Sequence, residues 1–500
     1  MEPFELRIQV SSVQVEITVT FLLWREKMGE RKSKMPHALL IPLPAQGHIN
    51  PMMQLAWKMV SDGFLVTFLN SDYNHQRIME TNAAKSLDDN CDMIRLISVP
   101  FALSPEECRN NPVNFLKVME NNMGPCVIDK VIQEINEKEV RRITCIVADV
   151  WTCFGLKAVA RFHGVPLVAF HSALVSLCAI RRFSSRLVSH GVLSSDGFAK
   201  EVKEVKYLPF LPPLSSGELP WLYAGEYGFR KGIQMTEEIK EIDWVLFNSF
   251  YEIEAPVVDV LSKELSVYPI GPLIPSEFLE GDRVRANKVI PSLWADNLEC
   301  LQWLDKQSTQ SVIYVSFGSI AAWGERYVEE LALGLEATQR PFLWVVRSDL
   351  MDGRKADFPT GFLERVTDRG CIVSWAPQLE VLSHPSIACF VTHCGWNSSQ
   401  ESITMGVPML CCPYFADQFL NRRYIVDVWK VGLPLNPNNE GIIEKAEFTR
   451  AVETLLVGEE GLEIRKEVRK LKRIARDAVK EGGTSYNNYN SFVNAMKNTT

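Results

Sequence analysis

The most constraining feature of this sequence is a strand–turn–helix unit in its C-terminal half. Residues 387–392 form an apolar run of the length expected for a buried parallel strand, and a His-Cys-Gly turn at 393–395 follows it. Asn397 and Ser398 then predict a helix N-terminus, with Glu401 completing a capping box. A helix beginning there points its free N–H groups at a ligand above the strand, which predicts an anion site, especially for phosphate.

Strand and helix patterns alternate over most of the chain. The apolar strand expected at 37–43 leads through a Gly-containing loop into a helix. Residues 52–60 show the helical periodicity, Asn50 is the expected N-cap and Pro51 the expected first helical residue. Further strands are expected at 64–70, 94–99, 143–148, 165–170, 243–249, 311–317 and 341–346. This alternation predicts parallel sheets covered by helices on both faces.

The length of 500 residues predicts two domains, because one hydrophobic core rarely serves so long a chain. The polar, irregular segment 274–298 is the expected linker between a first domain at 35–273 and a second at 299–483, followed by a C-terminal helix at 484–500. Residues 1–34 fit neither domain, so we expect an upstream extension or a mis-set start codon.

Composition and charge exclude several classes of protein. The content of 46% hydrophobic and 23% charged residues is that of a globular chain, and the net charge of -8 without a long basic cluster argues against nucleic acid as a partner. The twelve cysteines lack metal-ligand spacing and suggest reduced thiols. The most apolar N-terminal stretch, 10–24, is interrupted by Gln14 and Glu16, so we expect a cytoplasmic protein without a membrane span.

Polar and aromatic side chains suited to a nucleotide sugar surround the turn at 393–395. Trp375 offers a flat face for a base, and Glu401 can accept hydrogen bonds from ribose hydroxyls. The other candidates are Gln378 for the base edge or ribose, His393, Asn397 and Ser398 for phosphate oxygens, and Asp417 and Gln418 for sugar hydroxyls. Taken singly, each is better explained by a capped strand–helix unit with a buried tryptophan and a structural histidine. The prediction therefore rests on the whole set.

The set as a whole resembles a known family. W-x-P-Q at 375–378, H-C-G-W-N-S-x-x-E at 393–401 and D-Q at 417–418 are similar to the signature box of plant secondary-product glycosyltransferases, which transfer sugar from a UDP-sugar to small acceptors. The resemblance extends from about Met35 to the C-terminus. It implies the GT-B fold, an α/β architecture of two Rossmann-like, doubly wound parallel-sheet domains that face a central cleft, with the last helix packing back on the first domain. It also implies donor contacts at Ala376, Gly395, Trp396, Phe415 and Ala416.

Two residues of the first domain are candidates for catalysis. His48 lies in P-A-Q-G-H-I-N-P after the first strand, and this motif matches the family loop that carries the catalytic histidine. An alcohol needs such a base at neutral pH. Asp149 ends the strand at 143–148, and the matching carboxylate of the family orients the imidazole. A loop or helix-capping histidine and a helix-capping aspartate are the alternatives.

The expected reaction is an inverting, metal-independent transfer. The helix N-terminus at Asn397 and Ser398, His393 and Ser319 can stabilise the charge on the leaving UDP, and neither a paired-carboxylate metal motif nor an enzymic nucleophile is evident. We expect no permanently bound cofactor and UDP-glucose as the donor. In the family, Gln at the position of Gln418 is associated with glucose.

The sugar and the acceptor leave alternatives open. Trp396 is usual in glucose users, but Cys412 stands where many members carry a bulkier residue, so galactose, xylose and rhamnose remain possible donors. First-domain aromatic residues suggest an apolar pocket for a flavonoid, phenolic or terpenoid acceptor; they are Phe101, Trp151, Phe154, Trp221 and Tyr223.

Rival functions are an epimerase of similar fold, an oxidoreductase and a non-catalytic UDP-sugar-binding homologue. The oxidoreductase would need G-x-G-x-x-G after its first strand, which residues 45–51 lack. The intact His48, Asp149, Glu401 and Gln418 argue against loss of activity. We expect a monomer.

Overall fold

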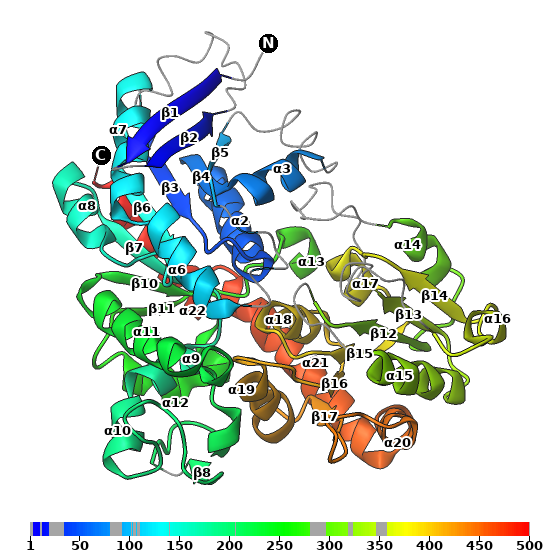
Figure 1. Cartoon of the computed structure of the whole chain (residues 1–500). Helices are drawn as coiled ribbons and strands as arrows, with labels where there is room; N and C mark the ends of the chain where they lie inside the picture. The colour runs from blue at the N-terminus through cyan, green and yellow to red at the C-terminus, as the bar shows by residue number, and fades with distance from the viewer. Residues whose placement is uncertain are drawn as a thin grey trace.

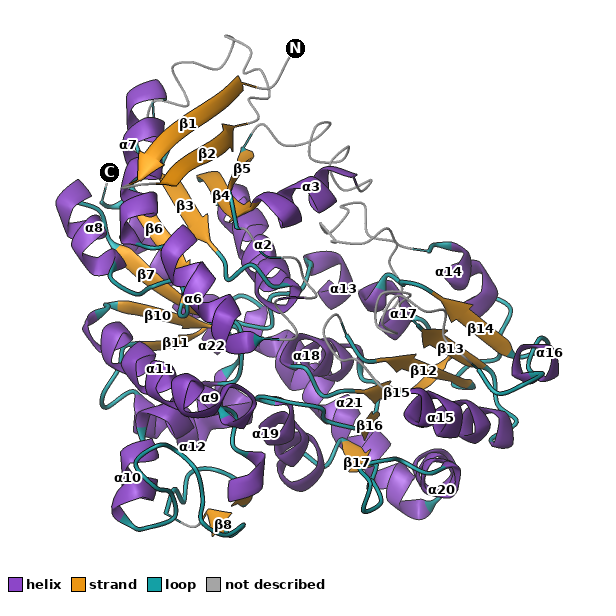
Figure 2. Cartoon of the chain, in the orientation of Figure 1, coloured by secondary structure: helices purple, strands orange, loops and turns teal. Residues whose placement is uncertain are grey.

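Two parallel β-sheets, each flanked by helices, form the core of the protein. The computed structural model describes residues 4–10, 13–19, 35–80, 93–101, 103, 107, 111–139, 141–205, 207–280, 297–318, 324–346 and 358–499. Figure 1 shows the sheet of the N-terminal half, with its blue-to-green helices, beside the sheet of the C-terminal half. In Figure 2 both sheets lie among helices, so the predicted fold of helix-covered parallel sheets is confirmed.

The sheet of the N-terminal half has seven parallel strands in the order β11-β10-β7-β6-β3-β4-β5. They are β3 (His37–Ile41), β4 (Leu65–Ser71), β5 (Ile94–Val99), β6 (Cys145–Asp149), β7 (Leu167–His171), β10 (Trp244–Phe247) and β11 (Val267–Pro269). From the neighbouring pair β3 and β6 the chain winds outward in both directions. The loops that leave these two strands therefore diverge, which makes their carboxyl ends the expected place for a ligand.

Helices pack on the N-terminal sheet through two apolar cores. These helices are α2 (Gln46–Ser61), α3 (Asp72–Glu80), α6 (Pro112–Asn122), α7 (Pro125–Lys138), α8 (Leu156–His163), α9 (Val175–Arg182), α10 (Ser184–Ser189), α11 (Gly225–Glu238) and α12 (Tyr251–Leu261). The fully buried strands β3, β4 and β6 carry mostly apolar residues, because a parallel sheet covered on both faces has no solvent side.

The sheet of the C-terminal half has six parallel strands in the order β14-β13-β12-β15-β16-β17. They are β12 (Val312–Ser316), β13 (Phe342–Val345), β14 (Gly370–Val373), β15 (Ile387–Thr392), β16 (Met409–Cys411) and β17 (Gly432–Pro434). Its helices are α14 (Glu299–Leu304), α15 (Glu325–Ala337), α16 (Phe362–Arg365), α17 (Gln378–Ser383), α18 (Trp396–Met405), α19 (Gln418–Arg423), α20 (Lys445–Leu456) and α21 (Glu459–Val479). Here the chain winds outward in both directions from the neighbouring pair β12 and β15. The turn before α18 follows β15, so it lies at the carboxyl ends of these two strands, where a ligand is expected.

The last helix, α22 (Thr484–Lys497), belongs to the core of the N-terminal half. Phe492 is fully buried in the same apolar core as strand residues of β3 and β4. Asn488 Nδ2 donates to Pro269 O at 2.8 Å, and Tyr489 OH donates to Asp62 Oδ2 at 2.7 Å. The chain thus returns to the N-terminal sheet after it has built the C-terminal one.

Helix α2 begins earlier than the sequence pattern suggests. It starts at Gln46 after an Ala45 N-cap in extended conformation, so the prediction of an Asn50 N-cap with Pro51 at the first position is wrong. Pro51 lies inside the helix, where it has no N–H to donate to Gly47 O. That carbonyl instead accepts a hydrogen bond from Asn397 Nδ2 at 2.8 Å, which supplies the missing partner. His48 consequently lies in the first turn of a helix and not in a loop.

Two further segments qualify the domain boundaries expected from the sequence. Residues 4–19 include an antiparallel pair, β1 (Phe4–Val10) and β2 (Val13–Val19). The segment expected to be a linker contains α13 (Ser276–Glu280), whose Phe278 is buried, while residues 281–296 lie outside the described part of the chain. Within the ranges that the structure describes, no helix has the length and apolarity needed to cross a bilayer.

The burial of α22 gives a stability prediction. Phe492→Ala is expected to lower the free energy of unfolding of the N-terminal half by about 3–5 kcal/mol, because it removes a ring from a closed core and leaves a cavity. Guanidinium unfolding followed by tryptophan fluorescence measures the change. Asn494→Ala, at an exposed position of the same helix, is the control and should change the free energy by less than about 0.5 kcal/mol. Equal effects of the two changes would contradict the packing of α22.

Candidate active site

His48 and Asp149 meet at the divergence of β3 and β6. His48 Nδ1 lies 2.7 Å from Asp149 Oδ2, and Ser172 Oγ lies 2.9 Å from the same nitrogen. Asp149 is fully buried, whereas the His48 side chain is 26% exposed. Because an ionised carboxylate only accepts hydrogen bonds, Nδ1 carries the ring proton and Nε2 keeps its lone pair. The structure thus brings together the two residues that sequence reasoning selected for catalysis.

The carboxylate of Asp149 is held in place from its other side. Its Oδ1 accepts a hydrogen bond from the backbone N–H of Trp151 at 3.0 Å, in the turn that follows β6. Both oxygens are therefore engaged, one by the imidazole and one by the turn. Such an arrangement fixes the imidazole orientation and stabilises its positive charge after it accepts a proton.

Ser172 and His171 are residues at this site that sequence reasoning missed. His171 is the last residue of β7 and Ser172 follows it. Because β7 is the neighbour of β6, both residues lie at the same edge of the sheet as Asp149. The His171 ring stacks on Phe247 with centroids 5.1 Å apart. Burial, together with the charges of Arg181 and His48, holds the pKa of His171 well below its usual range, so it stays neutral. The only sequence signal was their place at a strand end.

The turn between β15 and α18 differs from the predicted capping box. Helix α18 begins at Trp396 with Gly395 as N-cap, and no side chain caps it. The Ser398 and Glu401 side chains bond to α17 instead: Gln378 Nε2 donates to Ser398 Oγ at 2.9 Å and to Glu401 Oε2 at 2.7 Å. The prediction of a capping box is wrong because a neighbouring helix competes for both side chains. The N–H groups of the first turn of α18 have no side-chain cap, as an anion site requires.

The Gln378–Glu401 pair also sets the charge of the carboxyl. Burial raises the pKa of Glu401 to about 7, and the hydrogen bond from Gln378 opposes that rise. Tyr314 OH donates to Gln378 Oε1 at 3.2 Å, which orients the amide with its NH2 toward Glu401. Glu401 is thus a carboxylate that further donors, such as hydroxyls, would help to keep ionised.

His393 lies between two glycines at the N-terminus of α18. A Cβ at Gly318 would come within 2.7 Å of its ring, and one at Gly395 within 2.3 Å of Nε2, so only glycine leaves room for the imidazole. Burial lowers the pKa of His393 to about 4 despite a hydrogen bond with the Ser316 backbone. His393 Nδ1 is buried without a hydrogen-bond partner among the described residues. His393 is therefore a neutral imidazole whose Nδ1 is not satisfied by the described part of the protein.

The loop that precedes α19 is shaped by its own predicted site residues. Gln418 Oε1 accepts from the backbone N–H of Tyr414 at 2.8 Å and of Phe415 at 3.1 Å, and Ala416 has a left-handed φ of 54°. Asp417 Oδ2 accepts from Asn421 Nδ2 at 2.9 Å. The amide oxygen of Gln418 therefore fixes the loop.

Helix α18 joins the two halves of the molecule. Its Asn397 donates to Gly47 O, next to His48, as described above. Trp396 Nε1 donates to Asn248 O at 2.6 Å, and Gln400 Nε2 donates to the same carbonyl at 2.8 Å. The indole N–H of Trp396 thus donates a hydrogen bond from the C-terminal half to the N-terminal half. The uncapped N-terminus of α18 and the His48–Asp149 pair are consequently held on opposite sides of one junction.

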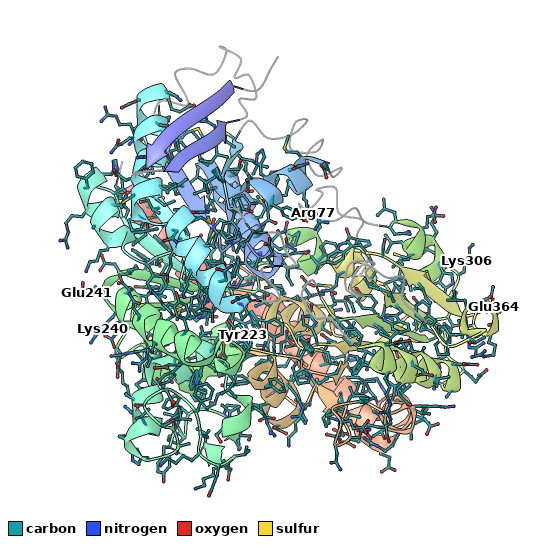
Figure 3. All side chains as sticks on the ribbon, viewed as in Figure 1. Arg77, Tyr223, Lys240, Glu241, Lys306 and Glu364 are labelled. Atoms are coloured by element: carbon teal, nitrogen blue, oxygen red, sulfur yellow. The ribbon has the colours of Figure 1, made fainter. Side chains whose placement is uncertain are left out.

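The remaining predicted residues have mixed positions. Trp375 is half-buried and Ala376 is buried, in the segment just before α17, while Ser319 lies outside the described residues. Among the aromatic residues expected to line an acceptor pocket, Phe101 and Trp221 belong to the apolar core, and Trp221 Nε1 donates to Gly197 O. Tyr223, labelled in Figure 3, is exposed at the junction of the halves, with its ring 5.6 Å from that of Phe415.

Comparison with known proteins identifies relatives along almost the whole chain. Residues 287–481 match the family described as UDP-glucoronosyl and UDP-glucosyl transferase. UDP-glycosyltransferase 83A1 of Arabidopsis thaliana is 34% identical over 481 residues, which cover 94% of this chain and 98% of that protein. (R)-mandelonitrile beta-glucosyltransferase of Prunus dulcis is 34% identical over 473 residues, covering 90% of this chain and 95% of that protein.

A solved structure is similar over the same extent. Os79 from O. sativa in complex with UDP aligns with a TM-score of 0.76 and 27% identity, covering 92% of this chain and 100% of that chain. The alignment confirms the GT-B fold, with two Rossmann-like domains built on the two parallel sheets. From its sequence and its fold together, this chain belongs to the UDP-glycosyltransferase family.

Proposed function

We propose that this protein transfers glucose from UDP-glucose to a hydroxyl of a small lipophilic molecule, with inversion at the anomeric carbon and without a metal ion. The observation that carries the proposal is the 2.7 Å contact between His48 Nδ1 and the buried Asp149 Oδ2, opposite the N-terminus of α18. A base that stands across from an anion site is what transfer from a nucleotide sugar to an alcohol requires.

The proposed step is a single displacement. His48 Nε2 takes the proton of the acceptor hydroxyl while the acceptor oxygen attacks C1 of the sugar. The bond between C1 and the diphosphate oxygen breaks, and its electron pair leaves with UDP. Asp149 stabilises the imidazolium that forms. Since the attack comes from the face opposite the leaving group, an α-linked donor gives a β-glycoside.

The donor would lie over the C-terminal half. The diphosphate suits the uncapped N–H groups at Gly395 and Asn397 and the neutral imidazole of His393, which together offer donors where the leaving charge develops. The base would stack on Trp375, and Glu401 would accept from the ribose. Ser319 is also proposed to stabilise the charge on the leaving UDP.

Glucose is the proposed sugar because Asp417 offers an acceptor and the NH2 group of Gln418 a donor for its hydroxyls, and because a relative is named as a glucosyltransferase. Galactose, xylose and rhamnose are the alternative sugars. The lipophilic acceptor is proposed from two aromatic side chains: Trp151, next to Asp149, and Tyr223, whose ring lies 5.6 Å from that of Phe415. We also propose that the reaction takes place in the cytoplasm and that the protein is a monomer.

Removal of the base tests the mechanism. His48→Ala is expected to lower kcat on a phenolic acceptor by about 10²–10⁴-fold, because the alcohol loses its general base, with the affinity for UDP-glucose nearly unchanged. Initial rates by liquid chromatography and calorimetric titration of the donor give the two numbers. His163→Ala is the matched control, since it removes another imidazole that lies 2.7 Å from a carboxylate, that of Asp129. A wild-type rate for the His48 variant would contradict the base assignment.

The raised pKa of Glu401 predicts a pH dependence of donor binding. Ribose hydroxyls that donate to the carboxylate favour its ionised form, so bound donor lowers the pKa and binding releases a proton. The affinity for UDP-glucose is therefore expected to rise with pH up to about 7 and to level off above it, with a slope of at most about tenfold per pH unit. The diphosphate of this donor is doubly esterified and does not titrate in that range.

Titrations between pH 5.5 and 8 in buffers of different ionisation enthalpy measure both the affinity and the released proton. Glu401→Gln removes the titrating group and keeps the shape of the side chain. Its affinity should be lower and independent of pH over this range. If the variant kept the slope of the wild type, the ribose contact would be assigned to the wrong residue.

A further inference from the structure

Arg181 is a buried charge that the proposed reaction does not use. It lies in the last turn of α9 and is 5% exposed. Its Nε and Nη1 atoms are buried and have no hydrogen-bond partner among the described residues. Buried N–H groups without acceptors are costly, and a guanidinium does not escape the cost by losing its proton. An acceptor group is therefore missing from its surroundings.

Its contacts place this guanidinium beside the His48–Asp149 pair. Arg181 Cζ lies 4.9 Å from the ring centroid of Trp151, the residue whose backbone N–H donates to Asp149. The stem of Arg181 passes Gly232 of α11, where an added Cβ would stand 3.1 Å from Cδ. The ring of Trp151 and the close approach of Gly232 to the arginine stem together fix the position of the guanidinium.

The charges around Arg181 come from both halves of the molecule. Its positive charge interacts with the carboxylates of Asp417 and Asp149 and with Tyr223, and it contributes to the low pKa of His171. Burial is nevertheless the larger effect and lowers the pKa of Arg181. Arg181 thus lies beside the His48–Asp149 pair, through its contact with Trp151, and within electrostatic range of Asp417 in the loop before α19. The acceptor of the proposed reaction would lie between these groups.

A purely structural role as a counter-charge would require a direct ion pair. The two carboxylates within its electrostatic range already have other partners: Asp149 bonds to His48 and to the Trp151 backbone, and Asp417 accepts from Asn421. Neither is hydrogen-bonded to Arg181 in the described part of the chain. Long-range attraction offsets part of the cost of burying the charge, but it does not satisfy the N–H groups. Nε and Nη1 therefore still lack an acceptor among the described residues.

We propose that Arg181 binds a carboxylate of the acceptor while the acceptor hydroxyl is presented to His48, so that hydroxy acids with an aromatic body are preferred substrates. A guanidinium pairs with a carboxylate through charge-assisted hydrogen bonds, and Trp151 stacks on its other side. This inference rests on the proposed glucosyl transfer and names the acceptor class for the same site.

Matched acceptor pairs test the inference on the wild-type protein. Hydroxybenzoate and hydroxycinnamate are each compared with their methyl esters, which keep the hydroxyl and the ring but lose the charge. We expect kcat/KM to be about 10–100-fold higher for at least one acid than for its ester, with the sugar on the hydroxyl, because charge-assisted hydrogen bonds have that size. Equal kcat/KM values for all pairs would overturn the inference.

Two variants locate the preference. Arg181→Gln is expected to reduce the acid-to-ester ratio about 10–100-fold, whereas Arg186→Gln should leave the ratio unchanged. Arg186 is the matched control because its guanidinium also stacks on an aromatic ring, 4.6 Å from the centroid of Phe183, but lies on the exposed side of α10. An unchanged ratio in Arg181→Gln would assign the acid preference to another residue and overturn the inference.

If Arg181→Gln does not fold, Gly232→Ala replaces it. The added methyl at 3.1 Å keeps the charge but displaces the arginine stem, so it should also reduce the acid-to-ester ratio. A wild-type protein that glucosylates the esters as well as the acids would overturn this inference and leave the proposed function intact. A protein that binds no UDP-glucose and glucosylates neither member of any pair would overturn both.

Discussion

The placement of the site depends on a carbonyl group that has no partner within its own helix. Pro51 has no N–H for Gly47 O, and Asn397 of α18 donates to that oxygen from the other half of the molecule. Two more side chains of α18 donate to Asn248 O. Because one helix supplies all three donors, its N-terminus is fixed in position opposite His48. The bonds to Asn248 O are buried, and a buried carbonyl without a donor is costly, so hydrogen bonding stabilises the junction as well as apolar contact.

A buried carboxylate holds the helix that carries Arg181. Glu254 accepts hydrogen bonds from the backbone N–H groups of Val175 and Ser176 at the N-terminus of α9 and from the Ser176 hydroxyl, which also bonds to Tyr424 OH of the C-terminal half. The positive end of a helix stabilises an anion at this position. Burial still raises the pKa of Glu254, and these hydrogen bonds oppose the rise. The orientation of α9, and with it the position of Arg181 in its last turn, therefore follows from a contact at the opposite end of the helix.

The fold was predictable from local patterns because buried parallel strands are almost uniformly apolar. The strand pattern at 387–392 agrees with β15, and the other expected strands lie within about two residues of the observed ones. Helix starts were less predictable. Asn50 with Pro51, and Ser398 with Glu401, are good local start signals, but tertiary partners used those groups otherwise. Short edge strands such as β14 and β17 carry too few residues for a period to be recognised.

The sequence by itself determined which chemical groups this protein presents: an imidazole after the first strand, a carboxylate at the end of another, and a polar turn before a helix in the second half. Those are properties of residues close in the chain, where pattern and spacing carry the information. Only the tertiary structure decided that Ser172 joins His48, that the oxygen of Gln418 fixes its own loop, and that Nε and Nη1 of Arg181 are buried without an acceptor in the described ranges. These facts depend on which strands are neighbours and on which donors reach an oxygen first, and they link residues far apart in sequence through directional contacts that no local pattern encodes.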